Sequence, residues 1–341
     1  MGWVRRIMLL VGALLVVAIA AAYLLPRHVR VERSAVIAAP RATVFTVLNS
    51  FKHFNKWSPW FELDTEAKYA YEGPGAGVGA RLSWTGDPKT LGSGSQIITA
   101  SQPYEKIEAD VDFGQGGTPA RQTYTLAAEG TGTRVAWSMA VDLGMNPFAR
   151  YFALRFDDMI AGDFDKGLAL LKTFAEGLPK ADFAGLEIEA ASVQPATVAY
   201  VPTSSAKDEA SVAAAIGKAY GEVGAFMKAQ GLKQAGAPIT IDTGASDTGY
   251  LFDAAIPVDR TPATPVPPDS RVRLKQTYGG KVLKVALRGA YSQIPATYDR
   301  IVAYIAAHGI ETNGNPWDEF ANDPATVKEP EVLTNIYFPI K

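Results

Sequence analysis

The stretch YGEVGAFMKAQGLKQAGAP, residues 220–238, returns in altered form as YDRIVAYIAAHGIETNGNP, residues 298–316. All shared positions lie at one constant spacing, 298 − 220 = 78 residues. The matching pairs are Tyr220/Tyr298, Val223/Ile301, Phe226/Tyr304, Met227/Ile305, Gly231/Gly309, Leu232/Ile310, Gly236/Gly314 and Pro238/Pro316. A single spacing that holds across the whole stretch indicates a duplicated unit.

Each copy is predicted to hold a leading strand, a second strand, a helix and two further strands. In the first copy the strands are predicted at 185–191, 196–201, 238–242 and 250–258, and the helix at 207–230. In the second copy they are predicted at 272–277, 281–288, 316–321 and 332–339, with the helix at 291–308. Gly231 and Gly309 follow the helices as C-caps. Residues 259–270, DRTPATPVPPDS, are predicted to be a loop, because proline cannot donate to a strand ladder.

One copy alone exposes an apolar sheet face and an apolar helix stripe. We therefore expect the copies, about 186–258 and 271–341, to pair about a pseudo-twofold axis with their sheets continuous or facing. A ligand cleft is expected on that axis, because two half-walls make one concave surface that a change in one copy can specialise.

The strand after the helix differs in chemistry between the copies. Adding 78 to Ile239 and Ile241 gives Trp317 and Glu319. A carboxylate has thus replaced an apolar side chain on the phase expected to face inward. Because an unpaired buried carboxylate is costly, we expect Glu319 to be protonated, paired with a protein cation, or open to a cationic or polar ligand.

Two alternatives remain open at this point. A slip of the strand by one residue would place Glu319 in water and turn Asp318 or Phe320 inward. In the second alternative the protein is an enzyme, a hydrolase that acts on a reactive small molecule with Glu319 beside Trp317 as general acid or base. The sequence contains no GxSxG motif and no cysteine nucleophile, so binding without catalysis is the preferred interpretation.

The C-terminal part resembles a known family. The residues NGNPWDEFANDPATVKEPEVLTNIYFPIK (313–341) are similar to the C-terminal signature of the GyrI-like, or AraC-type effector-binding, domain. The similarity extends back through RGAYSQIPATYDRIVAYIAAHG (288–309) and covers about residues 186–341. The resemblance implies that the acidic residue of this strand, here Glu319, contacts a ligand at the centre of the cleft among aromatic neighbours. The corresponding aromatic positions are Trp317, Tyr250 and Tyr298.

Two positions depart from the family pattern. Asp318 stands where glutamate is usual, and Phe320 replaces a common tyrosine and so removes a hydroxyl. The helix-turn-helix that often accompanies such domains is not found in the sequence. This argues against a transcription factor.

The first half of the chain is predicted to be an antiparallel sheet with a long closing helix. A strand at 29–38 and a short helix at 40–51 are followed by strands at 80–84, 96–100, 106–113, 122–127 and 134–141. The closing helix is predicted over 151–174, with Leu154, Met159, Phe164, Leu168, Leu171 and Phe174 on its apolar face.

This half resembles the SRPBCC superfamily, which has the polyketide cyclase and START-like helix-grip fold. The similar segments are FKHFNKWSPWF (51–61), YEGPGAGVGARLSWTG (71–86), TYTLAAEGTGTRVAWSM (123–139) and FDKGLALLKTFAEG (164–177). The resemblance covers about residues 31–177 and implies a deep apolar cavity between the curved sheet and the long helix. Trp60, Tyr71 and Trp84 are the candidate wall residues. The alternative for each is ordinary core packing.

Composition limits the functional classes. With 341 residues the chain has room for about two domains, and its net charge of −2 lacks the basic excess that nucleic acid requires. The three histidines are far apart in sequence and cysteine is absent, so neither a metal site nor a cofactor is expected.

The N-terminus is the one strongly apolar segment. Residues Ile7 to Leu25 carry no charge, and at 1.5 Å per residue they nearly cross a bilayer core of about 30 Å. We expect residues 1–28 to be a membrane anchor with the soluble part outside the cytoplasm, and a cleaved signal peptide is the alternative. The helix-grip domain is expected at 29–177, a linker at 178–185 and the GyrI-like domain at 186–341. The sequence thus predicts an α+β protein, tethered to the cell membrane, that binds hydrophobic or cationic small molecules.

Overall fold

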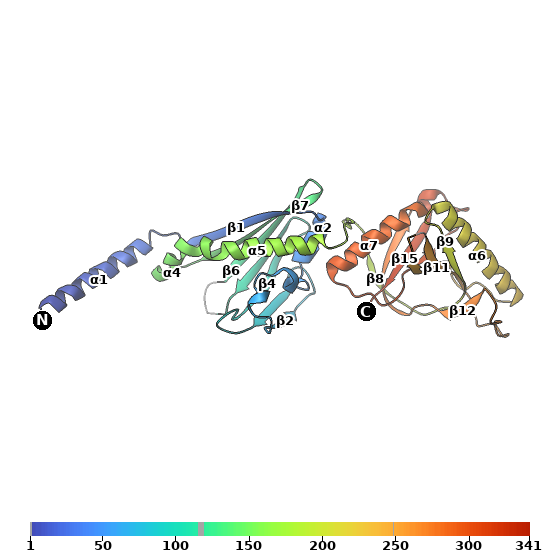
Figure 1. Ribbon diagram of the computed structural model, residues 1–341, viewed down its shortest axis with the longest axis horizontal. Coiled ribbons are helices and arrows are strands. Elements are labelled where there is room, and N and C mark those ends of the chain that lie inside the picture. The colour runs from blue at the N-terminus through green and yellow to red at the C-terminus, as the bar shows by residue number, and fades with distance from the viewer. Residues whose placement is uncertain (1, 115–118, 248) are drawn as a thin grey trace. The chain divides into compact units, whose positions relative to one another are not determined.

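The computed structural model describes residues 2–114, 119–247 and 249–341. The chain divides into two compact units, one formed by residues 1–183 with 303–309 and the other by 184–302 with 310–341. Figure 1 shows the elements of both. Each unit is described by itself below.

The first unit begins with helix α1, Gly2–Ala22. Within the described residues it is the helix that is long and apolar enough to cross a membrane, with a mean hydropathy of 2.3 over an 18-residue window in which no residue is buried. Its sequence holds no residue that would end a helix before Ala22, since Gly12 is its sole interior glycine.

A seven-stranded antiparallel sheet follows, in the order β1-β7-β6-β5-β4-β3-β2. Its strands are β1 (His28–Ile37), β2 (Lys68–Glu72), β3 (Arg81–Thr85), β4 (Ser93–Gln102), β5 (Lys106–Asp112), β6 (Ala120–Glu129) and β7 (Gly132–Asp142). Helices α2 (Arg41–Leu48), α3 (Phe54–Trp57), α4 (Pro147–Tyr151) and α5 (Phe156–Glu176) and the 3-10 turns η1 (Phe61–Leu63) and η2 (Phe152–Arg155) complete the unit. The long helix α5 runs across the sheet as the helix-grip fold requires (Figure 1).

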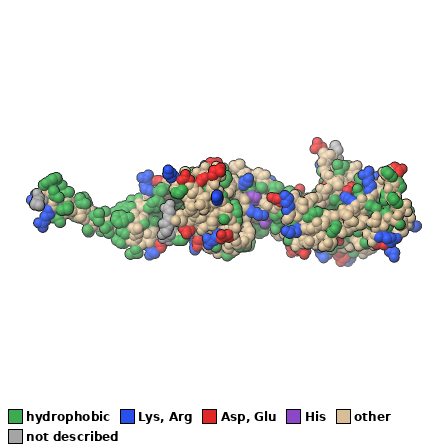
Figure 2. Space-filling model, turned by 90° about the horizontal axis from the view of Figure 1, so that it is seen from below, with side chains coloured by type: hydrophobic (Ala, Val, Ile, Leu, Met, Phe, Trp, Pro, Cys, Tyr) green, Lys and Arg blue, Asp and Glu red, His purple; other side chains and the backbone are tan. Residues whose placement is uncertain are grey.

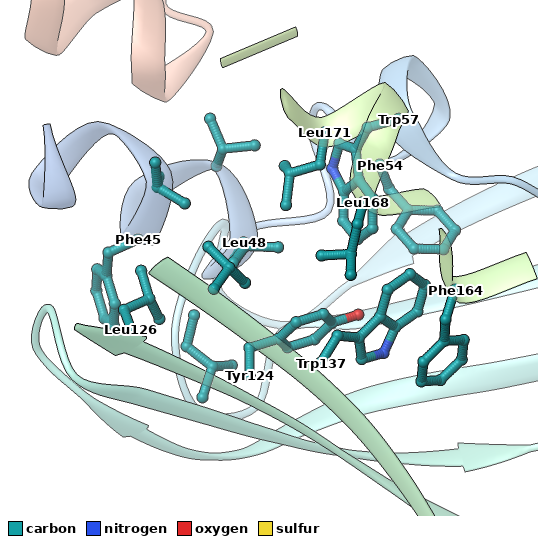
Figure 3. Close-up of a cluster of buried hydrophobic side chains, with 14 of the residues drawn as sticks. Phe45, Leu48, Phe54, Trp57, Tyr124, Leu126, Trp137, Phe164, Leu168 and Leu171 are labelled. Atoms are coloured by element: carbon teal, nitrogen blue, oxygen red, sulfur yellow. The ribbon is translucent and has the colours of Figure 1, made fainter. Parts of the chain in front are cut away.

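Aromatic side chains fill the space between the sheet and α5. Trp137 of β7 and Phe164 of α5 are completely buried, and their rings stack with centroids 4.0 Å apart. Figure 3 shows Trp57, Tyr124 and Leu168 closing around this pair. The side-chain Oε1 of Gln122 accepts hydrogen bonds from the Tyr124 hydroxyl and the Trp137 indole N–H at 2.8 and 3.2 Å, so these polar groups of the core satisfy one another.

The closing helix differs from its prediction at its start. Helix α5 begins at Phe156 rather than at residue 151, and Leu154 and Met159 are 63% and 52% exposed. The face of α5 that meets the core carries Phe156, Ile160, Phe164, Leu168 and Leu171. Leu154 precedes the helix and Met159 lies beside this face, so the expectation that they belong to the apolar face was wrong.

The second unit contains one continuous eight-stranded sheet, in the order β12-β9-β11-β10-β14-β15-β13-β8. Its strands are β8 (Glu189–Val193), β9 (Thr197–Ser205), β10 (Ile239–Ala245), β11 (Tyr250–Pro257), β12 (Arg273–Gln276), β13 (Gly280–Arg288), β14 (Trp317–Phe320) and β15 (Leu333–Pro339). Helices α6 (Glu209–Ala229) and α7 (Ile294–His308) cover one face, and η3 (Tyr291–Gln293) and η4 (Glu329–Glu331) are short 3-10 turns. Residues 259–270 form a loop without strand or helix, as predicted.

The strand order shows how the two copies combine. Strands β9, β11 and β10 of the first copy are mirrored by β13, β15 and β14 of the second, and the leading strands are exchanged, since β8 pairs with β13 and β12 with β9. The copies meet at β10 and β14, where Thr240 pairs with Asp318. Thr240 and Asp318 are also equivalent at the repeat spacing, 318 − 240 = 78. The pseudo-twofold axis therefore passes through this pair.

Candidate functional site

The three candidate residues of the helix-grip domain all contact or face its core, to different extents. Trp60 is half-buried, packs edge-on against Trp137 at 5.7 Å and donates its indole N–H to the Asp163 carboxylate at 3.0 Å. Tyr71 on β2 is 54% exposed and pairs with Leu82, which is fully buried. Trp84 lies on the same face two residues beyond Leu82 and is half-buried.

Two neighbouring strands of this unit carry buried donors that lack an acceptor. The Trp84 indole N–H on β3 and the Gln96 amide N–H₂ on β4 have no hydrogen-bond partner among the described residues. Gln96 pairs with Leu82, so both donors lie on the sheet face that meets α5. Leaving a buried donor unpaired costs about 1–3 kcal/mol, so this pair is suited to receive an acceptor from elsewhere.

In the second unit the sheet separates the predicted site residues onto two faces. Asp318 accepts a hydrogen bond from the Tyr298 hydroxyl of α7 at 3.0 Å, so it lies on the face that the helices cover. Tyr250 packs against the apolar cluster that α6 builds on this same face. Trp317 and Glu319 alternate with Asp318 along β14 and lie on the opposite face.

The face without helices therefore holds the pair that the sequence singled out. The ring of Trp317 stacks on Tyr337 with centroids 4.8 Å apart, and Trp317 is buried. Glu319 is half-buried and accepts a hydrogen bond from the Tyr337 hydroxyl at 2.9 Å. Trp317 and Glu319 do share a face, as the alternation predicts, but the structure does not bring Tyr298 or Tyr250 to them.

The helix-bearing face has its own acidic and aromatic group on the pseudo-twofold axis, which we call the axial site. It consists of Asp318, Thr240, Tyr298 and Tyr220. Thr240 donates to one Asp318 oxygen at 3.3 Å and Tyr298 to the other at 3.0 Å. Tyr220, the repeat equivalent of Tyr298, has a buried hydroxyl without a partner among the described residues.

Burial dominates the electrostatics of the axial site. It raises the pKa of Asp318 to about 7, against the two hydrogen bonds that lower it, and the nearby Asp242 charge raises it further. Among the residues that the structure describes, no lysine, arginine or histidine acts on Asp318. Burial and the Asp318 carboxylate likewise raise the pKa of Tyr298 well above its usual range. Asp318 thus changes its charge near neutral pH, and no cationic side chain in the described part of the chain balances it.

Further aromatic rings lie on the same face of the sheet as the axial site. Tyr298 contacts Phe338 with centroids 5.1 Å apart, and Phe320 contacts Tyr291 at 5.4 Å. The Lys207 ammonium lies 5.9 Å from the centre of the Tyr250 ring, which is the distance of a weak cation–π contact. Negative carboxylates and ring faces together attract a cation with an apolar body.

No group of His, Asp or Glu side chains in the described ranges has the arrangement of a metal site. The carboxylate of the axial site is Asp318, and the nearby Asp242 accepts the Gly244 backbone N–H at 2.8 Å. Hydroxyls and rings occupy the rest of the surroundings. The chemistry of the axial site therefore favours an organic ligand.

The sequence pointed to Asp318 in two ways, as the inward residue of a slipped strand and as a departure from the family pattern, and neither made it a site residue. The structure has no slip, and Asp318 and Glu319 simply occupy the two faces of β14. The signal that identifies the axial site is the same spacing of 78 residues, applied to Thr240 and Asp318 and to Tyr220 and Tyr298. All four equivalent positions meet on the pseudo-twofold axis, which a linear pattern does not display.

Family models match both halves of the chain. Residues 28–176 match the model described as polyketide cyclase / dehydrase and lipid transport, and residues 192–341 match that of the GyrI-like small molecule binding domain. No curated protein sequence matches this chain.

Several solved structures are similar in part. The EcmrR C-terminal domain is 13% identical with a TM-score of 0.41, over 46% of this chain and 98% of that domain. The CV1439 protein of Chromobacterium violaceum is 18% identical with a TM-score of 0.31, over 44% of this chain and 98% of that one. The di-domain ARO/CYC StfQ of the steffimycin biosynthetic pathway is 15% identical with a TM-score of 0.34, over 44% of this chain and 51% of StfQ.

The family models and the fold agree on both halves. The chain thus matches a polyketide cyclase-type, SRPBCC-like family model in its first half and the GyrI-like small molecule binding domain in its second.

Proposed function

We propose that the GyrI-like domain binds small lipophilic cations at the axial site, with Asp318 as the residue that recognises positive charge. The observation that carries this proposal is the carboxyl of Asp318, which two hydroxyls hold in place and which no cation of the described ranges neutralises. A buried carboxylate without a counter-ion is unfavourable until a cation arrives. A bound cation is therefore attracted by the Asp318 carboxylate and also removes the free-energy cost of leaving this buried charge without a counter-ion.

The aromatic rings at the axial site support the proposed preference for a lipophilic ligand. Tyr298 and Tyr220 come from equivalent positions of α7 and α6, so they contribute ring surface from both sides of the axis. Aromatic faces attract cations and also bury apolar area, by about 25 cal/mol per Å². We therefore expect aromatic cations to bind more tightly than small inorganic cations or neutral aromatic compounds.

Helix α1 and the helix-grip domain suggest where the protein lies and what else it binds. Helix α1 is long and apolar enough to hold the protein in a membrane, and we place the soluble units outside the cytoplasm. For the helix-grip domain we propose an apolar ligand that carries a hydrogen-bond acceptor. The unpartnered donors of Trp84 and Gln96 support this, and binding would require the tightly packed interior to open.

Two ions of the same shape and opposite charge test the axial site. Tetraphenylphosphonium, a cation, is expected to raise the melting temperature of the second unit in the full chain at pH 8, whereas tetraphenylborate is not. Asp318→Asn removes the charge at nearly constant shape, and we expect it to weaken cation binding by about tenfold or more. Glu319→Gln is the matched control on the other face of the same strand and should bind as the wild type does.

The outcome also separates the two carboxylates as candidates. If Glu319→Gln loses the response and Asp318→Asn keeps it, the ligand belongs to the face of Trp317 and Tyr337. Equal responses to the cation and the anion in the wild type would show that charge plays no part, and the proposal for the axial site would then fail.

A further inference from the structure

The connection between β7 and α5 exposes an unusual amount of apolar surface. Residues 145–155 read MNPFARYFALR and contain no acidic residue and two arginines. Met145, Phe148, Phe152 and Leu154 are 66%, 69%, 43% and 63% exposed. Full burial of one such side chain is worth about 1.5–3 kcal/mol, so a cluster of four in water indicates an interaction surface.

The topology places this connection at the end of the domain that α1 enters. The first residue of β1, His28, pairs with Asp142, the last residue of β7. Arg27 fixes the same point, because its guanidinium binds both carboxylate oxygens of Asp142 at 2.7 and 2.6 Å. The chain therefore leaves β7 beside the segment that links α1 to the sheet.

Specific contacts then hold the connection against the last turns of α1. The Tyr151 hydroxyl donates to the Ala18 carbonyl at 2.7 Å, and the Tyr23 hydroxyl donates to the Met145 carbonyl at 3.3 Å. Arg150 donates to the Tyr23 carbonyl at 3.3 Å, and its guanidinium lies 5.1 Å from the centre of the Tyr23 ring. Both tyrosines thus join the apolar helix to the connection.

An apolar hollow of about 320 Å³ lies between the two segments. Its walls are five side chains of α1 from Val11 to Ile19 on one side, and Pro147, Phe148 and Tyr151 on the other. The nine residues from Val11 to Ile19 span eight helical steps and rise by roughly 12 Å, so Phe148 and its neighbours run alongside the apolar part of α1. Figure 2 shows hydrophobic side chains continuing from α1 onto the adjoining part of the first unit.

We propose that residues 145–154 are a second membrane-contacting element, which enters the same leaflet as the C-terminal turns of α1 and holds acyl chains in the hollow beside it. The inference rests on the proposed role of α1 as an anchor. Continuity with an apolar helix identifies the partner as a lipid bilayer. Phe148 and Phe152 supply apolar side chains for the acyl region, Tyr151 has the residue type that gathers at the bilayer interface, and the exposed Arg155 side chain can reach lipid phosphates. The effect is to fix one end of the helix-grip domain at the membrane surface.

Spin labels on single cysteines test the proposal, because the natural chain contains no cysteine. The full chain is reconstituted in phosphatidylcholine and phosphatidylglycerol vesicles with a nitroxide at Phe148→Cys or Leu154→Cys. Leu14→Cys on α1 reports on the anchor, and Val78→Cys, an exposed apolar position of the same unit, is the aqueous control. Collisions with oxygen, which concentrates in lipid, are compared with collisions with a water-soluble nickel complex.

We expect the oxygen-to-nickel collision ratio at positions 148 and 154 to exceed that at position 78 severalfold and to approach that at position 14. A lipid-like ratio at position 14 with water-like ratios at 148 and 154 would overturn the inference and leave the anchor intact. A water-like ratio at position 14 would overturn the anchor and the inference together. Low collision rates with both reagents, with spin–spin broadening, would identify a second copy of the chain as the partner instead of lipid.

Discussion

The two copies of the repeat place the same tyrosine on the same face of the sheet, with different results. Tyr298 of the second copy donates to a carboxylate, while the Tyr220 hydroxyl of the first copy has no partner among the described residues. The cause lies on the axis, where the first copy has Thr240 and the second has Asp318. The symmetric fold brings positions 240 and 318 together on the axis. The single difference between threonine and aspartate at these positions therefore places one acidic group at the centre of the domain, rather than one in each copy away from the axis.

The largest effect is expected when both copies carry an acidic residue on the axis. Thr240→Asp would set two carboxyl groups side by side on the axis, where neither has a cation. We expect a loss of about 3–5 kcal/mol in the free energy of unfolding at pH 8, as for other unpaired buried charges. The loss should shrink at pH 5, because the pair then holds protons. Denaturant unfolding at both pH values measures the difference, with Thr240→Asn as the neutral control.

Removing the acid should have the opposite effect. The folded-state pKa of Asp318 is about 7 and its ordinary value is 3.8, so the folded protein binds this proton more tightly than the unfolded chain does. The contribution of Asp318 to stability is therefore highest below about pH 4, declines as the pH rises to about 7, and stays low above. Asp318→Asn is expected to stabilise the protein by about 2–4 kcal/mol at pH 8 and to leave its stability nearly unchanged at pH 4. An equal effect of the variant at both pH values would contradict the burial of this carboxyl.

The two tyrosines give a smaller and more local comparison. Tyr298→Phe loses a hydrogen bond to a charged group and should destabilise the protein by about 1.5–3 kcal/mol at pH 8. Tyr220→Phe removes a buried hydroxyl that has no partner, and it should be neutral or slightly stabilising. Thermal unfolding of the two single variants decides whether the copies differ as described, and equal losses would show that both hydroxyls are bonded.

The smallest effect is expected on the opposite face of β14. Glu319→Gln keeps an acceptor for the Tyr337 hydroxyl, and Glu319 is only half-buried. We expect a change below about 0.5 kcal/mol in the free energy of unfolding, which is usual for such substitutions. A loss comparable to that of Tyr298→Phe would indicate that this carboxylate has a larger structural role.

Much of the fold could be predicted from the sequence because its signals are long and repeated. The constant spacing of 78 residues leads directly to the duplicated unit and to its axis, and glycine marks both helix ends. The helix-grip half follows from alternating strands and a long amphipathic helix, and its fold class is confirmed. Strand β2, Lys68–Glu72, was not predicted, because KYAYE is short and lacks β-branched residues.

The site was harder to predict because both faces of the second sheet are apolar. Residues of α6 cover one face, and Val198, Ile239 and Tyr337 cluster on the other. Alternation along β14 therefore identifies two sets of side chains without showing which set meets the helices. Glu319 stood out beside Trp317, whereas Asp318 is distinguished only by contacts that bring Tyr298 and Thr240 to it. Leu154 and Met159 were misplaced for a different reason, since Leu154 precedes helix α5 and the face of that helix that meets the core runs through Phe156 and Ile160 instead of Met159.

The most direct test of the account is the number of protons released when a lipophilic cation binds. At pH 6 the Asp318 carboxyl is largely protonated, because its pKa is about 7, and it must ionise to pair with a bound cation. Titration calorimetry with tetraphenylphosphonium, in two buffers of different ionisation enthalpy, should therefore detect the release of close to one proton per site in the wild type and none in Asp318→Asn. Cation binding to the wild type without proton release would show that Asp318 is not the group that meets the charge.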